Sequence, residues 1–241
     1  VAILGHGGCG KTTLVEAMAY TTGITKRMGR VEEGNTISDY DKEEQKRLFS
    51  ISTTLVPILW EDTKINFLDT PGYFDFVGEV EEAVSAADAA VIVVSGKAGI
   101  EVGTKKAWEI CERFKLPRMI FVTDMDDDNA SFRNVVEALK EDYGNRIAPF
   151  HTPIRENEKF IGFVNVVKKA GRRFSNNLGE YVDGDIPDYC MEYTNAYRDA
   201  LMESIAETSE DLMNKFFEGE EFTMVEIENA IRSGGASCEM T

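Results

Sequence analysis

Short apolar runs alternate with longer amphipathic stretches through the first 147 residues. The apolar runs predict β-strands at residues 1–4, 55–60, 65–68, 89–94 and 118–122. The amphipathic stretches predict helices at residues 11–22, 76–86, 101–114 and 130–143. Strands and helices in alternation are typical of a mostly parallel sheet with helices on both faces. The sequence therefore predicts an α/β core over residues 1–147.

Residues 23–54 interrupt this alternation. The segment contains Gly29, Gly34 and many charged side chains, but it has no sustained hydrophobic period. It is also longer than most connections between structural elements. We therefore expect it to be either disordered or functional.

The pattern changes again after residue 147, and residues 148–241 are expected to form a smaller α+β subdomain. Two strands are predicted at residues 150–154 and 160–167, on either side of a turn at Glu156 and Asn157. Residues 172–185 are polar and contain glycine, so no element is predicted there.

Helices follow in this second module, at residues 189–208, 210–217 and 223–232. The longest carries an apolar stripe at four-residue spacing, formed by Tyr193, Tyr197, Leu201 and Ile205. Before the last helix, Thr223 and Glu226 are spaced as a capping box. The spacing predicts where that helix begins.

Charge and composition narrow the classes of function. The chain has 43 acidic and 26 basic side chains and a net charge of −17. This charge opposes direct binding of RNA, because nucleic-acid affinity comes mainly from Lys and Arg. No apolar run approaches the roughly 20 residues that span a bilayer, and no secretory signal is present, so we expect a cytoplasmic chain without membrane contact. Val1 already lies inside a strand pattern, which indicates a fragment.

Cysteine chemistry is not expected to be structural. The four cysteines lie far apart and form no CxxC pair, so free thiols are predicted at Cys9, Cys111, Cys190 and Cys238. Trp108 and Cys111 are expected in the core. Cys9 precedes a predicted helix, where a reactive thiolate is a second interpretation.

A phosphate-binding loop is the strongest motif. The pattern G-x-x-x-x-G-K-[ST] follows the first strand and opens a helix. Backbone amides of such a loop point inward, the lysine reaches the terminal phosphates, and the threonine hydroxyl binds Mg²⁺. The predicted nucleotide-binding residues of this loop are Gly5, His6, Gly7, Gly8, Cys9, Gly10, Lys11, Thr12 and Thr13. For His6, shaping the loop and contacting phosphate are equally open interpretations.

A second motif, Asp69-Thr70-Pro71-Gly72, ends the apolar strand at residues 65–68. A carboxylate at a strand end beside a phosphate loop can hold Mg²⁺ through water. The Gly72 amide is free to meet a γ-phosphate. By itself the motif is also a common turn.

Together these residues resemble the GTP-binding domain of translational GTPases, most closely elongation factor G and its paralogues. Residues 44–47 and Ser50 resemble the first switch, with Ser50 where the family has a Mg²⁺-binding Thr. Residues 69–76 resemble the second switch, and residues 99–104 resemble the turn before the next helix. Residues 150–241 are similar to the family's insertion.

The resemblance implies ligands and roles. Mg²⁺ and GTP or GDP are the expected ligands, with phosphates bound by Lys11 and the loop amides. The metal ligands would be Thr12 and Ser50, with Asp69 behind a water, and Gly72 would sense the γ-phosphate. Catalysis is assigned to Lys11 together with residue 73.

The resemblance also implies partners. The ribosome would be contacted through domains that this sequence lacks, and ribosomal stalk proteins through residues 148–241. We expect a monomer. The family continues into another strand and a closing helix, so both ends are expected to be cut.

Two positions depart from the family at the guanine site. A strand-end Asn-Lys-x-Asp is replaced by Thr123-Asp124-Met125-Asp126. Asp126 retains the base-reading carboxylate, while Thr123 shortens the Asn and Asp124 inverts the charge of the Lys. Since a base edge without its partners binds weakly, guanine selectivity is expected to fall. Asp127 and Asp128 are interpreted as a solvated cap on the next helix.

Catalysis is also expected to suffer. Tyr73 occupies the position where the family has the His that orients the attacking water, and a phenol is a poor proton acceptor at neutral pH. Gly8 replaces an Asp of the family's loop. The leading hypothesis is a GTP-hydrolysing switch module of an elongation factor G-like protein. The alternatives are a nucleotide-binding ribosome or scaffold module with little hydrolysis, and a ribosome-protection paralogue.

Overall fold

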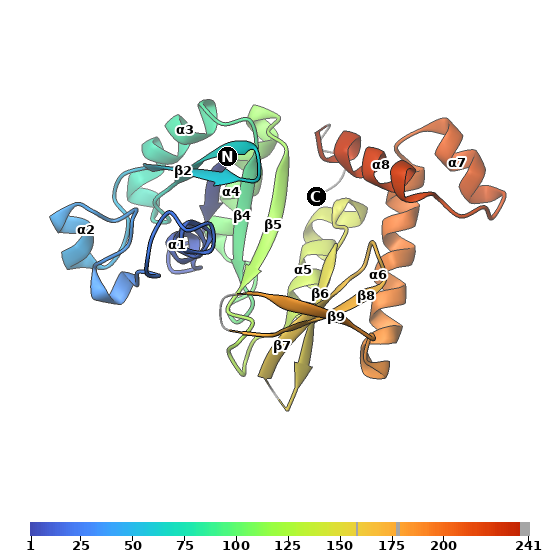
Figure 1. Cartoon of the computed structure of the whole chain (residues 1–241). Coiled ribbons are helices and arrows are strands. Elements are labelled where there is room, and N and C mark those ends of the chain that lie inside the picture. Colours follow the sequence, from blue (N-terminus) through green and yellow to red (C-terminus); the bar gives the residue numbers. More distant parts are fainter. Residues whose placement is uncertain (158, 177–178, 237–241) are drawn as a thin grey trace. The chain divides into compact units, whose positions relative to one another are not determined.

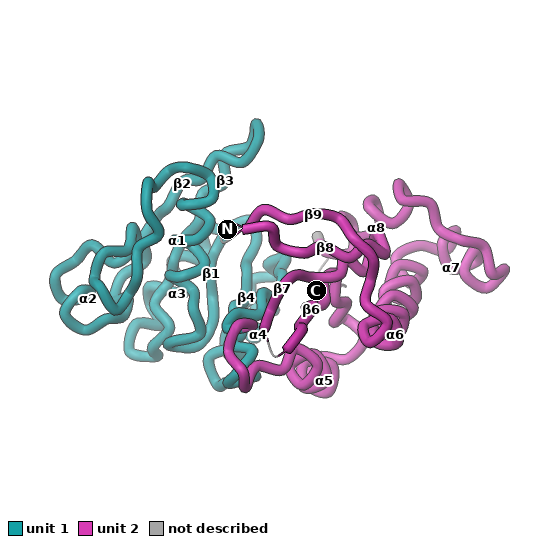
Figure 2. The backbone as a smooth tube through the Cα atoms, turned by 60° about the horizontal axis from the view of Figure 1, so that its bottom comes forward, with its two compact units in different colours: residues 1–124 teal, residues 125–241 magenta. Residues whose placement is uncertain are grey.

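The computed structural model describes residues 1–157, 159–176 and 179–236. It divides into two compact units, residues 1–124 and 125–241 (Figure 2). Within the described residues, no helix is long and apolar enough to cross a membrane.

The first unit contains a five-stranded sheet (Figure 1). The strand order is β2-β3-β1-β4-β5. Its strands, in chain order, are β1 (Ala2–Gly5), β2 (Thr54–Trp60), β3 (Thr63–Asp69), β4 (Ala90–Ser95) and β5 (Arg118–Thr123). β1 pairs in parallel with β3 and β4, and β4 with β5. Only β2 is antiparallel, because it forms a hairpin with β3. The predicted mostly parallel sheet is confirmed.

Helices flank this sheet. They are α1 (Lys11–Thr21), the short α2 (Lys42–Arg47), α3 (Val77–Ser85) and α4 (Val102–Phe114), with 3₁₀ turns η1 (Val31–Glu33) and η2 (Phe74–Phe76). Ile3 of β1, Val15 of α1 and Val93 of β4 lie in one buried cluster. Trp108 and Cys111 of α4 are buried, as predicted. The core fixes the end of β1 against the start of α1, where the phosphate motif lies.

The segment of residues 23–54 is folded, with η1 and α2 along it. Polar groups hold it in place of an apolar stripe. Glu44 is buried, and its Oε1 accepts the amides of Ile51 at 2.9 Å and Ser52 at 3.1 Å. The disorder alternative is therefore wrong for this structure.

The second unit has a four-stranded antiparallel sheet in the order β6-β7-β8-β9. The strands are β6 (His151–Glu156), β7 (Lys159–Asn165), β8 (Ala170–Phe174) and β9 (Tyr181–Gly184). The predicted first pair is confirmed, but β8 and β9 were not predicted. Arg172 pairs with Asp183 at 3.1 Å and Arg173 with Glu156 at 2.8 Å. These ion pairs between strands replace the apolar alternation that would have revealed them.

The helices of this unit are α5 (Phe132–Tyr143), α6 (Asp188–Ala206), α7 (Glu210–Phe217) and α8 (Met224–Ala236), with a 3₁₀ turn η3 (Gly144–Arg146) after α5. Tyr197, Leu201 and Ile205 of the predicted stripe are buried in its core, and Tyr193 packs against them. The three predicted helices are confirmed, although α8 extends to Ala236.

The boundary between the units differs from the predicted one at residues 147 and 148. It falls at Asp124, because α5 belongs to the second unit. Val136 of α5 lies in the same buried cluster as Ala148, Leu201 and Ile205. The amphipathic pattern predicted α5 as a helix but carried no information on which core would receive its apolar face.

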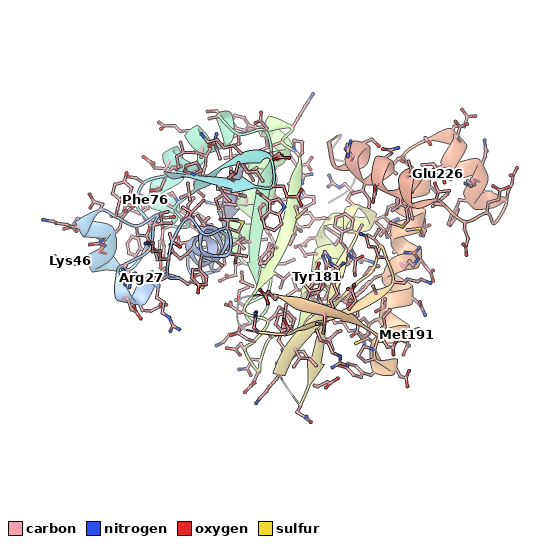
Figure 3. All side chains as sticks on the ribbon, in the orientation of Figure 1. Arg27, Lys46, Phe76, Tyr181, Met191 and Glu226 are labelled. Carbon is pink, nitrogen blue, oxygen red and sulfur yellow. The ribbon has the colours of Figure 1, made fainter. Side chains whose placement is uncertain are left out.

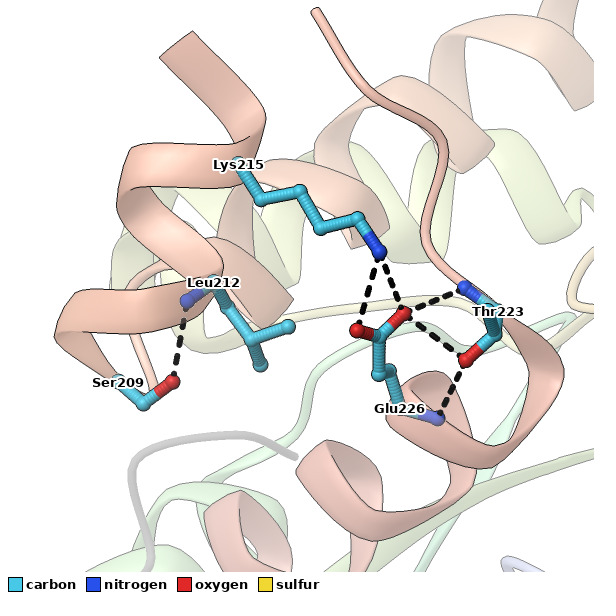
Figure 4. A network of polar contacts seen from close by, with 5 residues as sticks. All are labelled: Ser209, Leu212, Lys215, Thr223 and Glu226. Carbon is cyan, nitrogen blue, oxygen red and sulfur yellow. Dashed lines mark hydrogen bonds and ion pairs between the residues drawn. The ribbon is translucent and has the colours of Figure 1, made fainter. Parts of the chain in front are cut away.

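The capping box of α8 is formed as predicted (Figure 4). Glu226 Oε2 accepts the Thr223 amide at 2.7 Å, and the Glu226 amide donates to Thr223 Oγ1 at 3.3 Å. Lys215 of α7 contacts both Glu226 oxygens at 3.0 Å. The Thr223 amide and the Lys215 ammonium lower the pKa of Glu226 to about 2. The cap of α5 differs from the prediction: Ser131 accepts the Asn134 amide, whereas Asp127 accepts the Asn129 amide within the preceding turn.

Candidate nucleotide-binding site

The predicted phosphate loop connects β1 to α1. Gly8 and Gly10 have φ angles of +82° and +90°, a backbone conformation that residues other than glycine rarely adopt. Gly10 directly precedes the helix, whose first-turn amides, including that of the exposed Thr13, have no acceptor within the helix. The loop therefore presents backbone donors and the positive end of a helix dipole, a combination that binds anions.

Lys11 lies across this loop. Its side chain is buried at 6% exposure, and its ammonium donates to the His6 carbonyl at 2.8 Å. This position keeps the cation beside the loop amides. An entering phosphate would meet a charge that the loop already holds in place.

The second motif meets the phosphate loop at Gly72. A Cβ at this position would lie 2.7 Å from the Gly7 amide nitrogen and nearer still to Lys11 Nζ, so only glycine fits. Thr70 is fully buried, and its hydroxyl donates to the Ile3 carbonyl of β1 at 2.6 Å. The structure therefore brings together two motifs that lie far apart in the sequence. The plain-turn interpretation of residues 69–72 does not explain this contact.

The three candidate metal ligands converge with a fourth residue. Thr12 Oγ1 lies 3.2 Å from Ser50 Oγ, and Ser50 Oγ donates to Asp39 Oδ1 at 2.7 Å. Asp69 is 1% exposed, and neither of its oxygens has a hydrogen-bond partner among the described residues. Asp39 is buried too and was missed by the sequence analysis, because nothing in its local pattern distinguishes it.

These residues fit a magnesium ion. Mg²⁺ takes oxygen ligands, and a buried carboxylate without a partner is unfavourable unless a cation or donor completes it. Burial raises the pKa of Asp69 to about 6, and the nearby hydroxyls of Ser38 and Thr12 and the charge of Lys11 only partly oppose the shift. Among the described residues, neither hydroxyl makes a hydrogen bond of ordinary geometry with the Asp69 oxygens. Burial also raises the pKa of Asp39. The orphaned oxygens of Asp69 are the structural feature that a metal would explain.

Tyr73 lies beside the phosphate loop. A Cβ at Gly7 would lie 3.0 Å from the Tyr73 ring, and the Phe49 ring packs on Tyr73 with centroids 4.7 Å apart. The phenol remains 45% exposed. The structure thus places the predicted catalytic position next to the loop, with its ring held between the loop and the residue before Ser50.

His6 points toward α4. Its Nδ1 accepts the Gly103 amide at 3.3 Å, and its Nε2 lies 3.5 Å from Glu101 Oε1. Of the two interpretations of His6, these contacts favour shaping of the loop. Cys9 is 1% exposed, and burial raises the pKa of its thiol, so the reactive-thiolate interpretation is not supported. Cys238 lies outside the described residues.

A residue at the end of β5 makes a hydrogen bond to the phosphate loop. Thr123 Oγ1 donates to the Cys9 carbonyl at 2.8 Å, a bracing contact that the sequence analysis did not anticipate. Asp124 adopts a left-handed φ of 55°, and its Oδ2 accepts the Ser95 hydroxyl at 2.5 Å. Asp126 lies beyond the unit boundary, in an exposed turn of the second unit. Thr123 and Asp124 therefore have structural partners in the first unit.

Two comparisons with known proteins show what the chain is similar to. The family described as "Elongation factor Tu GTP binding domain" matches residues 1–230. A crystal structure of a protein from Thermus thermophilus is similar over 99% of this chain, with 39% sequence identity and a TM-score of 0.92. The chain spans 36% of the length of that protein. The predicted resemblance to a translational GTPase domain is confirmed.

Proposed function

The chain belongs to the family of the elongation factor Tu GTP-binding domain, and from this membership we propose that it is the GTP-binding and GTP-hydrolysing switch module of an elongation factor G-like translation factor. The contact of Gly72 with Gly7 and Lys11 carries the proposal. A γ-phosphate held by the loop would lie within reach of the Gly72 amide, so loss of that phosphate would release the second switch.

Each side chain has a proposed role. Lys11 and the loop amides hold the phosphates, and Thr12, Ser50 and Asp69 would hold Mg²⁺. Bound there, the metal would neutralise phosphate charge during phosphoryl transfer. Asp39 accepts the Ser50 hydroxyl and so fixes the first switch near Thr12.

Base recognition is proposed for Asp126, whose carboxylate is exposed. Thr123 would act indirectly, by holding the loop through the Cys9 carbonyl. The Asp124 carboxylate is engaged by Ser95, so Asp124 would contribute little to binding the base. Guanine selectivity would then be lower than a full set of contacts gives.

A second function, nucleotide binding with little hydrolysis, is favoured by Tyr73. Its ring packs against Gly7 and Phe49, and it carries no group that accepts a proton readily at neutral pH. Single-turnover hydrolysis of GTP by the chain, with and without ribosomes, separates the two functions. We expect about 10⁻⁴ to 10⁻² per second for the chain alone and acceleration by ribosomes. Undetectable turnover in both cases would favour the binding module.

The proposed partners follow from the second unit. We place contact with acidic ribosomal stalk proteins on this unit, whose α7 and α8 leave Phe217 78% and Val225 67% exposed. Direct RNA binding by this chain is not part of the proposal, given its net charge of −17. The proposed site of action is the ribosome in the cytoplasm, with this chain as a monomer.

A further inference from the structure

We infer that Glu16 fastens residues 29–39, the segment that leads into the first switch and is called the switch segment below, to α1, the helix that follows the phosphate loop. We infer that this attachment favours binding of a nucleoside triphosphate over a diphosphate. The inference deepens the proposed function and rests on it. Glu16 contacts no nucleotide in this scheme, so it is a positioning residue.

Each carboxylate oxygen of Glu16 accepts a hydrogen bond from a backbone amide. Its side chain lies inside the first unit at 2% exposure. Oε1 accepts the Gly29 amide at 2.8 Å, and Oε2 accepts the Ile37 amide at 2.7 Å. A buried carboxylate needs such donors, and hydrogen bonds to an ionised group are stronger than neutral ones. One side chain of α1 therefore holds both ends of the loop between residues 29 and 37.

The loop is shaped to receive this carboxylate. A Cβ at Gly29 would lie 2.8 Å from Glu16 Oε1 and 2.6 Å from the Asn35 carbonyl oxygen. Only glycine therefore lets the backbone at position 29 come this close to Glu16. Within the loop, the Arg30 amide donates to Asn35 Oδ1 at 2.7 Å. Hydrogen bonds within the loop set its conformation, and the Glu16 carboxylate connects the loop to α1.

The same face of α1 makes a second attachment. Thr12 lies one helical turn before Glu16, so the two side chains share a face. Thr12 Oγ1 lies 3.2 Å from Ser50 Oγ, whose hydrogen donates to Asp39 Oδ1. Asp39 follows Ile37 closely in the chain. The switch segment is therefore tied to α1 at Thr12, where the metal would bind, and at Glu16, where no ligand is needed.

These two ties differ in what they require. The tie at Thr12 involves the proposed metal ligands and would depend on the nucleotide. The Glu16 tie is made by the protein alone and reduces the conformational entropy that a triphosphate must overcome to order the segment.

Beside the Glu16 tie, a cavity of about 410 Å³ is lined mainly by polar residues: Glu16, Thr25, Lys26, Arg27, Asn35, Thr36 and Ile37. Ile37 also packs against the buried cluster that contains Val15 and Ala19 of α1, so apolar contact and hydrogen bonds together hold the segment on this side.

The test compares Glu16→Gln with Glu43→Gln in the whole chain. Glu43 lies on α2, is exposed and pairs with Arg47, so its variant removes the same charge without touching α1. Gln at position 16 can keep one acceptor but turns an amide group toward the second backbone N–H. With Mg²⁺, we expect affinity for a non-hydrolysable GTP analogue to fall about tenfold and affinity for GDP less than threefold. Glu43→Gln should change neither.

Two further readouts show whether the segment itself is released. Arg27, labelled in Figure 3, is exposed near the start of the segment, so trypsin cleavage there reports local opening. With the analogue bound, cleavage should become faster in Glu16→Gln only. Amide hydrogen exchange at Gly29 and Ile37 needs no nucleotide. Because Gln retains one acceptor, at least one of these two amides should lose protection in Glu16→Gln.

Retained protection of both amides in Glu16→Gln would overturn the inference. So would equal losses of GDP and analogue affinity with a lower unfolding midpoint, because Glu16 would then merely support the fold. Failure of the wild-type chain to bind either nucleotide would refute the proposed function, and with it the claimed preference for the triphosphate. The exchange result would then decide the attachment alone.

Discussion

Replacing Asp69 with Asn should make the chain more stable while it removes a metal ligand. Asp69 is 1% exposed and its oxygens lack hydrogen-bond partners among the described residues. Burial raises its pKa from the ordinary 3.8 to about 6. The difference corresponds to about 3 kcal/mol by which the ionised form destabilises the metal-free fold at pH 7.5. Asn carries no charge and so avoids this destabilisation, but burying its amide group costs about 1 kcal/mol. We therefore expect Asp69→Asn to raise the free energy of unfolding by about 2 kcal/mol.

The pH dependence of the free energy of unfolding is a second check on the sign of the Asp69→Asn effect. The folded chain binds the Asp69 proton more tightly than the unfolded chain, so the wild type gains stability as pH falls from 7.5 toward 4. Between pH 7.5 and 5 that gain is about 1.4 kcal/mol, and the advantage of Asp69→Asn should shrink by the same amount. Other carboxyls cancel in the difference between the two proteins, except for Asp39, whose charge is coupled to Asp69.

Urea unfolding in EDTA measures both effects. Trp60 and Trp108 both lie in the first unit, so tryptophan fluorescence reports the unit that contains Asp69. The control is Asp62→Asn, an exposed aspartate in the turn between β2 and β3, which should change stability by less than about 0.5 kcal/mol. The reasoning is refuted if Asp69→Asn is less stable than the wild type at pH 7.5, or if the gap does not narrow at pH 5.

Three further predictions concern the nucleotide. Lys11→Ala should weaken GDP binding at least tenfold in calorimetry, since a charged phosphate contact is lost, and the chain should still unfold in one cooperative urea transition; unaltered affinity would contradict the assignment of the loop. Tyr73→His should raise single-turnover GTP hydrolysis, by up to about 10²-fold, and no increase would show that the water position is lost for another reason. Thr123→Asn with Asp124→Lys should tighten GDP more than ADP in paired titrations; equal tightening would mean that this segment does not read the base.

The phosphate loop was predictable because its spacing dictates local backbone shape. Gly8 and Gly10 adopt the left-handed conformations that the motif needs, directly between a strand and a helix. The approach of Gly72 to that loop followed from the parallel order of β1 and β3, since such strands end at the same sheet edge. Local rules and sheet topology therefore gave these parts of the site.

The rest depends on partners that have no sequence signature. Glu16 interrupts an apolar helix face and is satisfied by backbone amides, which every residue carries. Asp39 acquires its role only when Ser50 folds back onto it. Thr123 was interpreted as a shortened guanine contact, yet its hydroxyl supports the Cys9 carbonyl. In each case, tertiary hydrogen bonds decide the role.

The most direct test of a magnesium-dependent GTP-binding switch is calorimetric titration of the chain with GTP, GDP, ATP and ADP, each with and without Mg²⁺. The account predicts that guanine nucleotides bind and that Mg²⁺ tightens GTP, because Thr12, Ser50 and Asp69 converge beside the loop. Adenine nucleotides should bind more weakly by a factor of about 10 to 10³, given the reduced set of base contacts. Absence of binding, affinity for GTP that ignores Mg²⁺, or ATP bound as tightly as GTP would contradict it.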